Sequence, residues 1–121
     1  MKPVRIQRRR AKGFKLPPNT VCVDRSTKWG NPFVVGRDGT RNACVRWHYL
    51  LLGGLFNLSV KSPSLDEQLA YLKYVNKNIG LLRGKNLACW CALPKSGEDD
   101  ECHAAELLKI ANVPQPKRKG E

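Results

Sequence analysis

The segment covering residues 87–91 and the Cys102-His103 pair that follows it constrain the fold of this chain most strongly. Leu87-Ala88-Cys89-Trp90-Cys91 continues a run that begins at residue 86 and predicts a buried strand. Cys102-His103 stands at the expected start of a helix. Because α/β proteins place ligands and chemistry where their strands end, this strand–helix corner predicts both the fold class and the position of a functional site.

Three other segments are predicted to be extended. Residues 20–24, Thr-Val-Cys-Val-Asp, are rich in β-branched side chains and predict a second buried strand. Residues 4–6 favour a short strand, although the Arg8-Arg9-Arg10 run after it is equally compatible with a flexible arm. Residues 33–35 favour a short extended piece that ends at a Gly-containing turn. If the segments 20–24 and 86–91 are parallel neighbours, the loops that follow them share one edge of the sheet.

Three helices are predicted between and after these strands. The first covers residues 41–52 with Thr40 as its cap, and the second starts at a capping box formed by Ser64 and Glu67 and continues to about residue 79. A third follows the acidic residues 99–101 and ends near residue 112. The apolar face predicted for the second helix consists of Leu65, Leu69, Leu72, Val75 and Ile79.

The alternation of strands and helices predicts one small α/β (or α+β) domain with a short, mostly parallel sheet and about three helices. A Rossmann-like three-layer arrangement is compatible with this order. We divide the chain into a basic N-terminal arm (residues 1–15), a globular α/β domain (16–113) and a basic, flexible tail (114–121).

Positive charge gathers at the two ends of the chain. The net charge is +12, and residues 1–15 contain seven basic side chains and no acidic one. Such ends attract polyanions, so nucleic acid or a phosphorylated nucleotide is the predicted partner, and a basic surface that only maintains solubility is the alternative. Arg8, Arg9, Arg10 and Lys12 are expected to contact phosphates without reading the base sequence.

Several classes of protein are disfavoured. No apolar run approaches the roughly 20 residues that span a bilayer, and the N-terminus lacks the apolar core of a secretory signal, so no membrane partner is expected. Five cysteines, an odd number, predict free thiols or metal ligands in the cytoplasm rather than a disulfide framework. The sequence also lacks a helix-turn-helix, an aromatic ribonucleoprotein motif and the His-x-Glu of zinc deaminases.

Cys89, Cys91, Cys102 and His103 are the candidate ligands of a metal ion, because thiolates and imidazole are the donors that Zn²⁺ prefers. Alternate residues of a strand face the same way, so Cys89 and Cys91 can share an ion. Neighbouring residues of a helix diverge by about 100°, so Cys102 and His103 can both bind only if the helix begins after them. Cys22 is the alternative ligand, and a metal-free reactive site or simple core packing are the alternatives to a metal.

In the metal-free alternative, Cys102 is the candidate nucleophile, because a helix N-terminus stabilises a thiolate. His103 or His48 would be its base. The acidic residues 99–101 oppose formation of that thiolate, and His48 is otherwise expected to be a surface or interface histidine.

The loop of residues 28–33, Lys-Trp-Gly-Asn-Pro-Phe, follows the strand 20–24 and cannot continue it. Lys28 suits a phosphate, Trp29 can stack on a base and the Asn31 amide can pair with a base edge. In the alternative interpretation, Trp29 and Phe33 fill the core and Asn31 satisfies its own turn. The tryptophans expected to pack in the core are Trp47 and Trp90.

With this loop and the strand–helix corner taken together, the chain resembles the domain of unknown function 4326 family, short proteins common in bacteriophages and bacteria. The resemblance covers about residues 5–112. In two places the chain departs from the family pattern: Ala105 stands where the family usually has Asp, and the insert 97–101 lengthens the spacing. The resemblance implies an architecture and the positions of the site, and no reaction. Its most specific parts are Arg8 to Phe14 with Pro17-Pro18-Asn19, Lys28 to Phe33, Ala88-Cys89-Trp90-Cys91 and Cys102-His103-Ala104.

Three functions follow from these observations as hypotheses. The first is a small basic phage-type protein that binds nucleic acid, its body stabilised by the Cys/His site. The second is an enzyme that processes a nucleotide or a nucleic-acid base in a crevice between residues 28–33 and 89–103, with Asn31, Cys102 and His103 as candidate catalytic residues. The third is a factor that interacts with a host protein.

Overall fold

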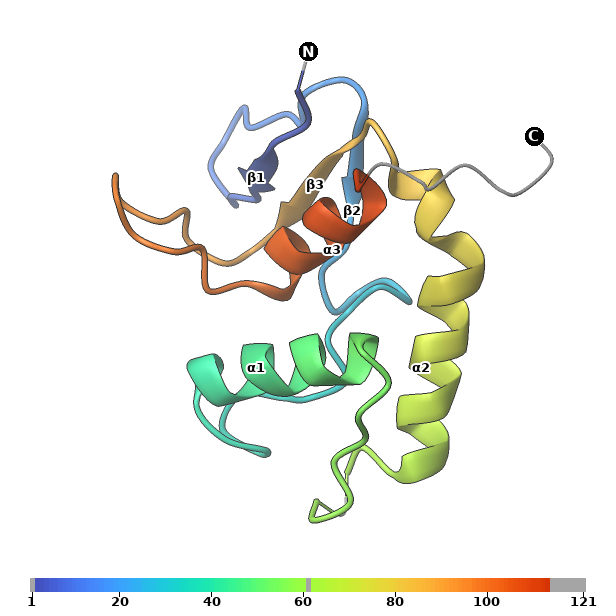
Figure 1. Ribbon diagram of the computed structural model, residues 1–121. Coiled ribbons are helices and arrows are strands. Elements are labelled where there is room, and N and C mark those ends of the chain that lie inside the picture. The colour runs from blue at the N-terminus through green and yellow to red at the C-terminus, as the bar shows by residue number, and fades with distance from the viewer. Residues whose placement is uncertain (1, 61, 114–121) are drawn as a thin grey trace, which may run out of the picture.

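A three-stranded parallel sheet carries the strand–helix corner (Figure 1), and the computed structural model describes residues 2–60 and 62–113. The strands are β1 (Arg5–Gln7), β2 (Thr20–Cys22) and β3 (Asn86–Cys89), in the order β1-β3-β2. Leu87 of the central strand is fully buried and pairs with Arg5 on one side and Val21 on the other. The predicted small α/β domain with a short parallel sheet is confirmed, and the predicted tail, 114–121, lies outside the described residues.

The strands differ in length from the prediction. β2 and β3 each end two residues early, at Cys22 and Cys89, and residues 5–7 rather than 4–6 form β1. Residues 33–35 form no strand, since Val35 makes only an isolated bridge to Gly39. The early strand ends release residues 23–24 and 90–91 at the carboxyl edge of the sheet, where their side chains are free to build a site.

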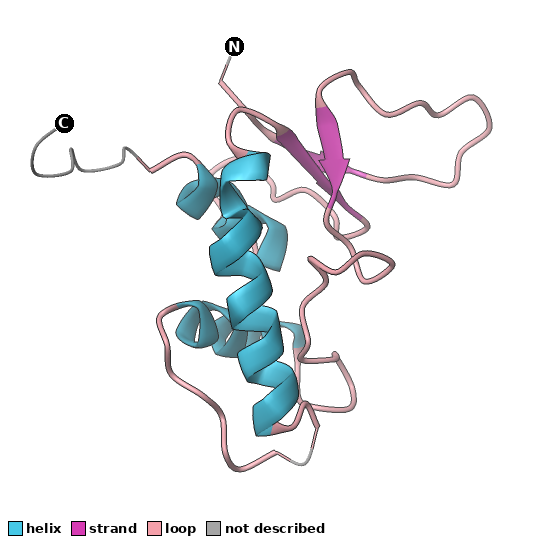
Figure 2. Cartoon of the chain, turned by 90° about the vertical axis from the view of Figure 1, so that its right-hand side faces the viewer, coloured by secondary structure: helices cyan, strands magenta, loops and turns pink. Residues whose placement is uncertain are grey.

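The helices α1 (Arg41–Leu52), α2 (Leu65–Asn78) and α3 (His103–Ala111) lie on one side of the sheet, and a 3-10 helix, η1 (Ile79–Leu82), continues α2. Figure 2 shows the helices to one side of the strands, with α3 packed on the sheet and α1 below it, so the described residues do not form the three-layer variant. The predicted caps are present. The Thr40 hydroxyl accepts the Ala43 amide at 3.2 Å, and the Ser64 hydroxyl accepts the Glu67 amide at 3.1 Å.

The predicted apolar face of α2 is buried only in part: Val75 is 2% exposed, and Leu72 and Ile79 pack against the core. Leu65 and Leu69 are 49% and 36% exposed, whereas Gln68 is fully buried beside Tyr71. The Gln68 side-chain oxygen accepts the Asn57 amide at 2.8 Å, and its side-chain nitrogen donates to the carbonyls of Asn57 at 2.8 Å and Pro63 at 3.0 Å. These three hydrogen bonds fix the rotation of the helix, because they satisfy polar backbone groups of the preceding loop that would otherwise be buried without partners.

The core lies between the sheet and the helices, and α3 packs directly on β3. None of the described helices combines the length and the apolar character needed to cross a bilayer. The largest buried apolar side chains of the core are Phe33, Leu51, Leu82, Leu87 and Leu107.

Candidate functional site

A pocket of about 230 Å³ lies at the carboxyl ends of β2 and β3. Three parts of the chain line it: residues 24–35 after β2, the first turns of α1, and the corner between β3 and α3. Ligands of parallel sheets bind at this edge, and the predicted strand–helix corner forms one wall of this pocket.

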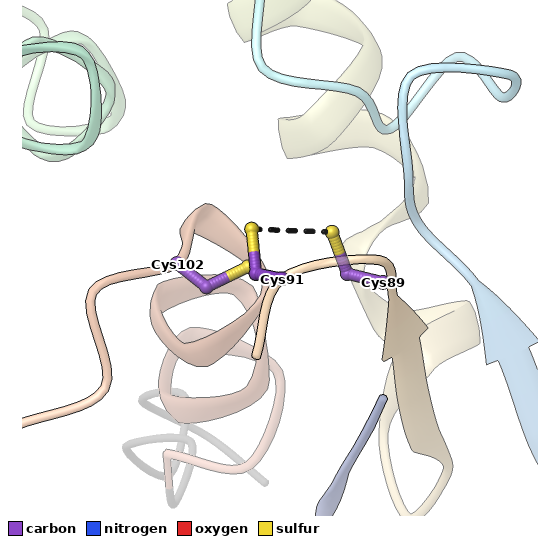
Figure 3. Close-up of side chains that lie close together, drawn as sticks. All are labelled: Cys89, Cys91 and Cys102. Carbon is purple, nitrogen blue, oxygen red and sulfur yellow. Dashed lines mark hydrogen bonds between the residues drawn. The ribbon is translucent and has the colours of Figure 1, made fainter. Parts of the chain in front are cut away.

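Three cysteines converge at the base of this pocket (Figure 3). Cys89 ends β3, Cys91 follows two residues later and Cys102 is the N-cap of α3. Their three sulfur atoms lie within 4.8 Å of one another, and those of Cys89 and Cys91 are 3.9 Å apart. Three thiolates at this separation can hold one metal ion.

The predicted ligands Cys22 and His103 lie outside the group of three sulfurs. α3 begins at His103, so Cys102 keeps an extended backbone and the adjacent pair is not held in consecutive helical positions. His103 is buried, and its Nε2 donates to the Val23 carbonyl at 2.7 Å. Its Nδ1 therefore carries the free lone pair, and this atom lies 3.8 Å from the Cys102 sulfur.

Hydrogen bonding within the cluster favours the thiolate form of Cys91 over that of Cys102. Hydrogen bonding from the Cys102 and Cys89 thiols, and then from the Arg41 guanidinium, holds the pKa of Cys91 far below its usual range. Hydrogen bonding with Cys89 and Cys91, together with burial, raises the pKa of Cys102. Cys102 is also fully buried, so Cys91 rather than Cys102 is the thiol best prepared to bind a metal or to react.

Trp90, expected in the core, is instead 40% exposed beside the pocket, whereas Trp47 is partly buried against the core. Two arginines lie over the Trp90 ring: the guanidinium carbons of Arg8 and Arg10 are 4.6 Å and 5.2 Å from its centroid. Arg8 is also ion-paired with Asp24, which is buried. We call Arg8, Arg10 and Trp90 the arginine–tryptophan platform.

The basic N-terminal segment has two kinds of residue. Arg5 is 7% exposed; it forms an ion pair with Asp100 and donates to the carbonyls of Cys91 at 2.9 Å and Ala92 at 2.6 Å, so it holds the strand–helix corner. Arg9, Arg10 and Lys12 are exposed, as contacts with phosphates require.

The loop 28–33 follows the alternative interpretation, in which its aromatic residues fill the core. Trp29 and Phe33 are 6% and 1% exposed, and the Trp29 ring packs edge-on against Tyr74. The Asn31 side chain donates to the Cys44 carbonyl at 3.1 Å and accepts the Phe33 amide at 3.0 Å. Lys28 is exposed, and its nitrogen lies 5.8 Å from the Tyr74 ring centroid. Of the proposed binding residues in this loop, only Asn31 lines the pocket.

His48 is fully buried rather than at the surface. Its Nε2 lies 2.7 Å from the Tyr71 hydroxyl and its Nδ1 lies 3.1 Å from a Glu106 carboxyl oxygen. Burial lowers the pKa of His48 to about 3 and that of His103 to about 4. Neither imidazole is thus suited to accept a proton and hold it near neutral pH.

Sequence reasoning missed Asp24 and Arg41 as site residues. Asp24 directly follows a buried strand, which is a usable signal for a residue at the carboxyl edge. The sequence gives no comparable signal for Arg41, because its contact with Cys91 depends on how α1 packs against the strand–helix corner.

A scan against protein-family models matches residues 6–113 to the family described as "Domain of unknown function (DUF4326)". Searches of the curated proteins and of the solved structures found no match for the chain.

Proposed function

The chain belongs to the DUF4326 family, whose description names no activity, and we propose that it binds single-stranded nucleic acid. The observation that carries this proposal is the arginine–tryptophan platform, in which two guanidinium groups lie over an indole that is 40% exposed. Aromatic rings and the planes of arginine guanidinium groups both stack on unpaired bases of any sequence, and the guanidinium charge attracts the phosphates.

The charges around the platform support the same function. Arg9, Lys12 and Lys15 are exposed in the segment that carries Arg10, so a strand stacked on Trp90 meets further cations along its backbone. Because these contacts release counterions, affinity falls steeply as salt rises. A duplex hides its base faces inside the helix, so the platform favours a single strand.

Fluorescence anisotropy with labelled single-stranded DNA and RNA and with the matching duplexes, at several salt concentrations, tests the proposal. Trp90→Ala should weaken single-strand binding by about 1–3 kcal/mol, roughly 5- to 150-fold. Tyr49→Ala, at an aromatic residue that is 64% exposed on α1, is the matched control. Absence of single-strand binding even at low salt, or equal losses in the two variants, would contradict the proposal.

We also propose that Cys89, Cys91 and Cys102 bind zinc, with His103 Nδ1 as the fourth ligand. A zinc-bound imidazole usually donates its other N–H to an oxygen, and His103 already donates Nε2–H to Val23. Sulfur and nitrogen ligands of one tetrahedral zinc lie about 3.6 Å apart, close to the 3.8 Å between Cys102 Sγ and His103 Nδ1. His103 is not within 4.8 Å of all three sulfurs, so binding of zinc would have to draw the imidazole toward the cluster. Bound zinc would tie the end of β3 to the start of α3.

Metal analysis of the freshly purified protein tests the zinc site. We expect one zinc per chain, lost together with much of the thermal stability on chelation. Cys91→Ser should abolish binding, whereas Cys22→Ser, at the alternative ligand, should retain it. Protein that is stable and metal-free, or zinc lost in the Cys22 variant, would contradict this ligand set.

A second candidate function is an enzyme acting on a nucleotide or base, favoured by the low pKa of the Cys91 thiol at the wall of the pocket. In this alternative Cys91 takes the nucleophile's role that the sequence suggested for Cys102. Rapid alkylation of one thiol that Cys91→Ser removes, in metal-free protein, would favour it over the zinc site.

We place the protein in the cytoplasm, that of the host if the chain is phage-encoded. All five cysteines are free thiols, as expected in a reducing compartment.

The hypothesis of a host protein partner has one supporting observation, the leucines exposed between α1 and α2, with Leu55 62% and Leu58 75% exposed.

A further inference from the structure

We propose that the pocket at the carboxyl edge receives one unstacked base of the bound strand. This inference rests on the proposed binding of single-stranded nucleic acid and names the part of the ligand that the pocket takes. The inference is based on Trp90, which belongs both to the arginine–tryptophan platform and to the pocket. Arg8 and Arg10 lie over its ring, and the residue also lines the pocket.

The size of the pocket selects its occupant. Pockets for drug-sized ligands have volumes of about 300–1,000 Å³, and this pocket has about 230 Å³. The space suits one planar ring system and is too small for a base together with its neighbours. A strand that runs over the platform therefore places a single base in the pocket.

The walls of the pocket match the chemistry of a base. Phe33, Val35 and Val45 give apolar contacts for the faces of a ring. The Asn31 amide and the Asp24 carboxylate also line the pocket, but both already have hydrogen-bond partners within the protein. These two side chains therefore offer little to a base edge, and the apolar wall favours recognition by shape and stacking, which predicts weak discrimination among bases.

Arg25 offers the bound nucleic acid a contact outside the inserted base. It lines the pocket and is exposed, so its guanidinium suits the phosphate next to the inserted base. Arg25 and the apolar wall should then contribute separately, the first to any strand and the second only to a strand with a base in the pocket.

The experiment compares two oligonucleotides that differ at one central position, one with a normal base and one with an abasic site. The strands should be short enough for a single protein to bind, so that the central nucleotide occupies the pocket. Affinities are measured for the wild type, for Val45→Phe, which fills the pocket from α1, and for Val113→Phe, a matched change at a residue 51% exposed at the end of the described chain. Thermal unfolding confirms that each variant is folded.

We expect the wild type to bind the intact strand about tenfold more tightly than the abasic strand. Val45→Phe should erase this difference by weakening only the intact strand, and Val113→Phe should preserve it. Arg25→Ala should weaken both strands alike. Equal affinity of the wild type for the two strands, or a Val45→Phe variant that keeps the preference, would overturn base insertion while leaving strand binding in place. Absence of binding to either strand would overturn both.

Discussion

Arg8 and Asp24 form an ion pair that joins the residue following β1 to the loop following β2. The pair crosses the carboxyl end of the central strand, β3. The guanidinium carbon of Arg8 also lies 4.6 Å from the centroid of the Trp90 ring. Asp24 also accepts the Ser26 amide at 2.9 Å and the Ser26 hydroxyl. One buried carboxylate therefore orients an arginine of the platform and organises the loop that begins the pocket.

Asp24→Asn should destabilise the fold by about 1–3 kcal/mol, because an amide nitrogen cannot accept the donors that now meet both carboxylate oxygens. Burial raises the pKa of Asp24, but hydrogen bonds from Ser26 and Arg8 outweigh it and leave the pKa below 3.8. This contribution to stability is present above pH 3.8 and is lost as pH falls through the lower folded value. Urea unfolding across acidic pH measures it, with Asp99→Asn in an exposed loop as control. A variant as stable as the wild type at pH 7 would contradict this role.

Gln68→Ala should cost about 2–3 kcal/mol, because it leaves the buried backbone groups of Asn57 and the Pro63 carbonyl without partners. Leu69→Ala, one residue later and 36% exposed, should cost less than about 0.5 kcal/mol. Chemical denaturation of the two variants measures the contrast. A larger loss of stability in Leu69→Ala than in Gln68→Ala would mean that Leu69 packs in the core, as the sequence predicts.

This contrast shows where sequence reasoning works and where it stops. The α1 bounds, 41–52, were predictable because Thr40 and Gly53 mark its ends locally. The predicted face of α2 was right at Leu72 and Val75, but the burial of Gln68 was not predictable, because its partners lie in a loop without periodicity. Gln68 is polar, so a pattern of apolar residues excludes it from the face on which it belongs.

The candidate site shows the same division. Cys89, Cys91 and Cys102 were predictable as a group because the first two alternate along a strand and the third begins the next helix. Trp90 was assigned to the core because the predicted strand ran to Cys91, whereas β3 ends at Cys89 and releases its ring to the surface. Such a difference of two residues in the length of a strand decides whether an indole is buried or exposed.

Glu106, His48 and Tyr71 form a chain of hydrogen bonds, and the last acceptor in the chain fixes which atom donates at each step. The Tyr71 hydroxyl donates to the Trp29 carbonyl at 2.9 Å, so it accepts the Nε2–H of His48. His48 Nδ1 is then an acceptor, and Glu106 must donate to it as a neutral acid. Burial raises the pKa of Glu106 to about 7, in agreement with this order.

Because the folded pKa of Glu106 is raised, its contribution to stability is complete below pH 4.5 and is lost as pH rises through about 7. Glu106→Gln donates to His48 at every pH and should lack this loss. The free energy of unfolding of the wild type should therefore fall relative to the variant by about 1–3 kcal/mol between pH 4.5 and pH 7, nearer the lower value because the carboxyl is 18% exposed. Urea titrations across this range measure it, with Glu98→Gln as the exposed control. Parallel stability curves for the wild type and Glu106→Gln would rule out the neutral acid.

Gly30 lies in the loop 28–33 at a point where two backbone segments meet. A Cβ at this position would be 2.6 Å from the Cα of Arg25 and 3.1 Å from the Asp24 carbonyl oxygen. Backbone atoms cannot swing aside as a flexible side chain can, so Gly30→Ala must displace the segment that carries both residues. We expect a loss of about 2–3 kcal/mol in the free energy of unfolding.

The matched control for this change is Gly80→Ala in η1, where a Cβ would meet nothing within 4 Å. That variant should keep its stability to within about 0.5 kcal/mol or gain up to about 1 kcal/mol, because alanine restricts the unfolded chain. Denaturation with urea compares the two variants. Gly30→Ala should also weaken single-strand binding, since displacement of residues 24 and 25 moves the partner of Arg8 and the mouth of the pocket together. Wild-type stability in Gly30→Ala would show that the two segments are not in contact.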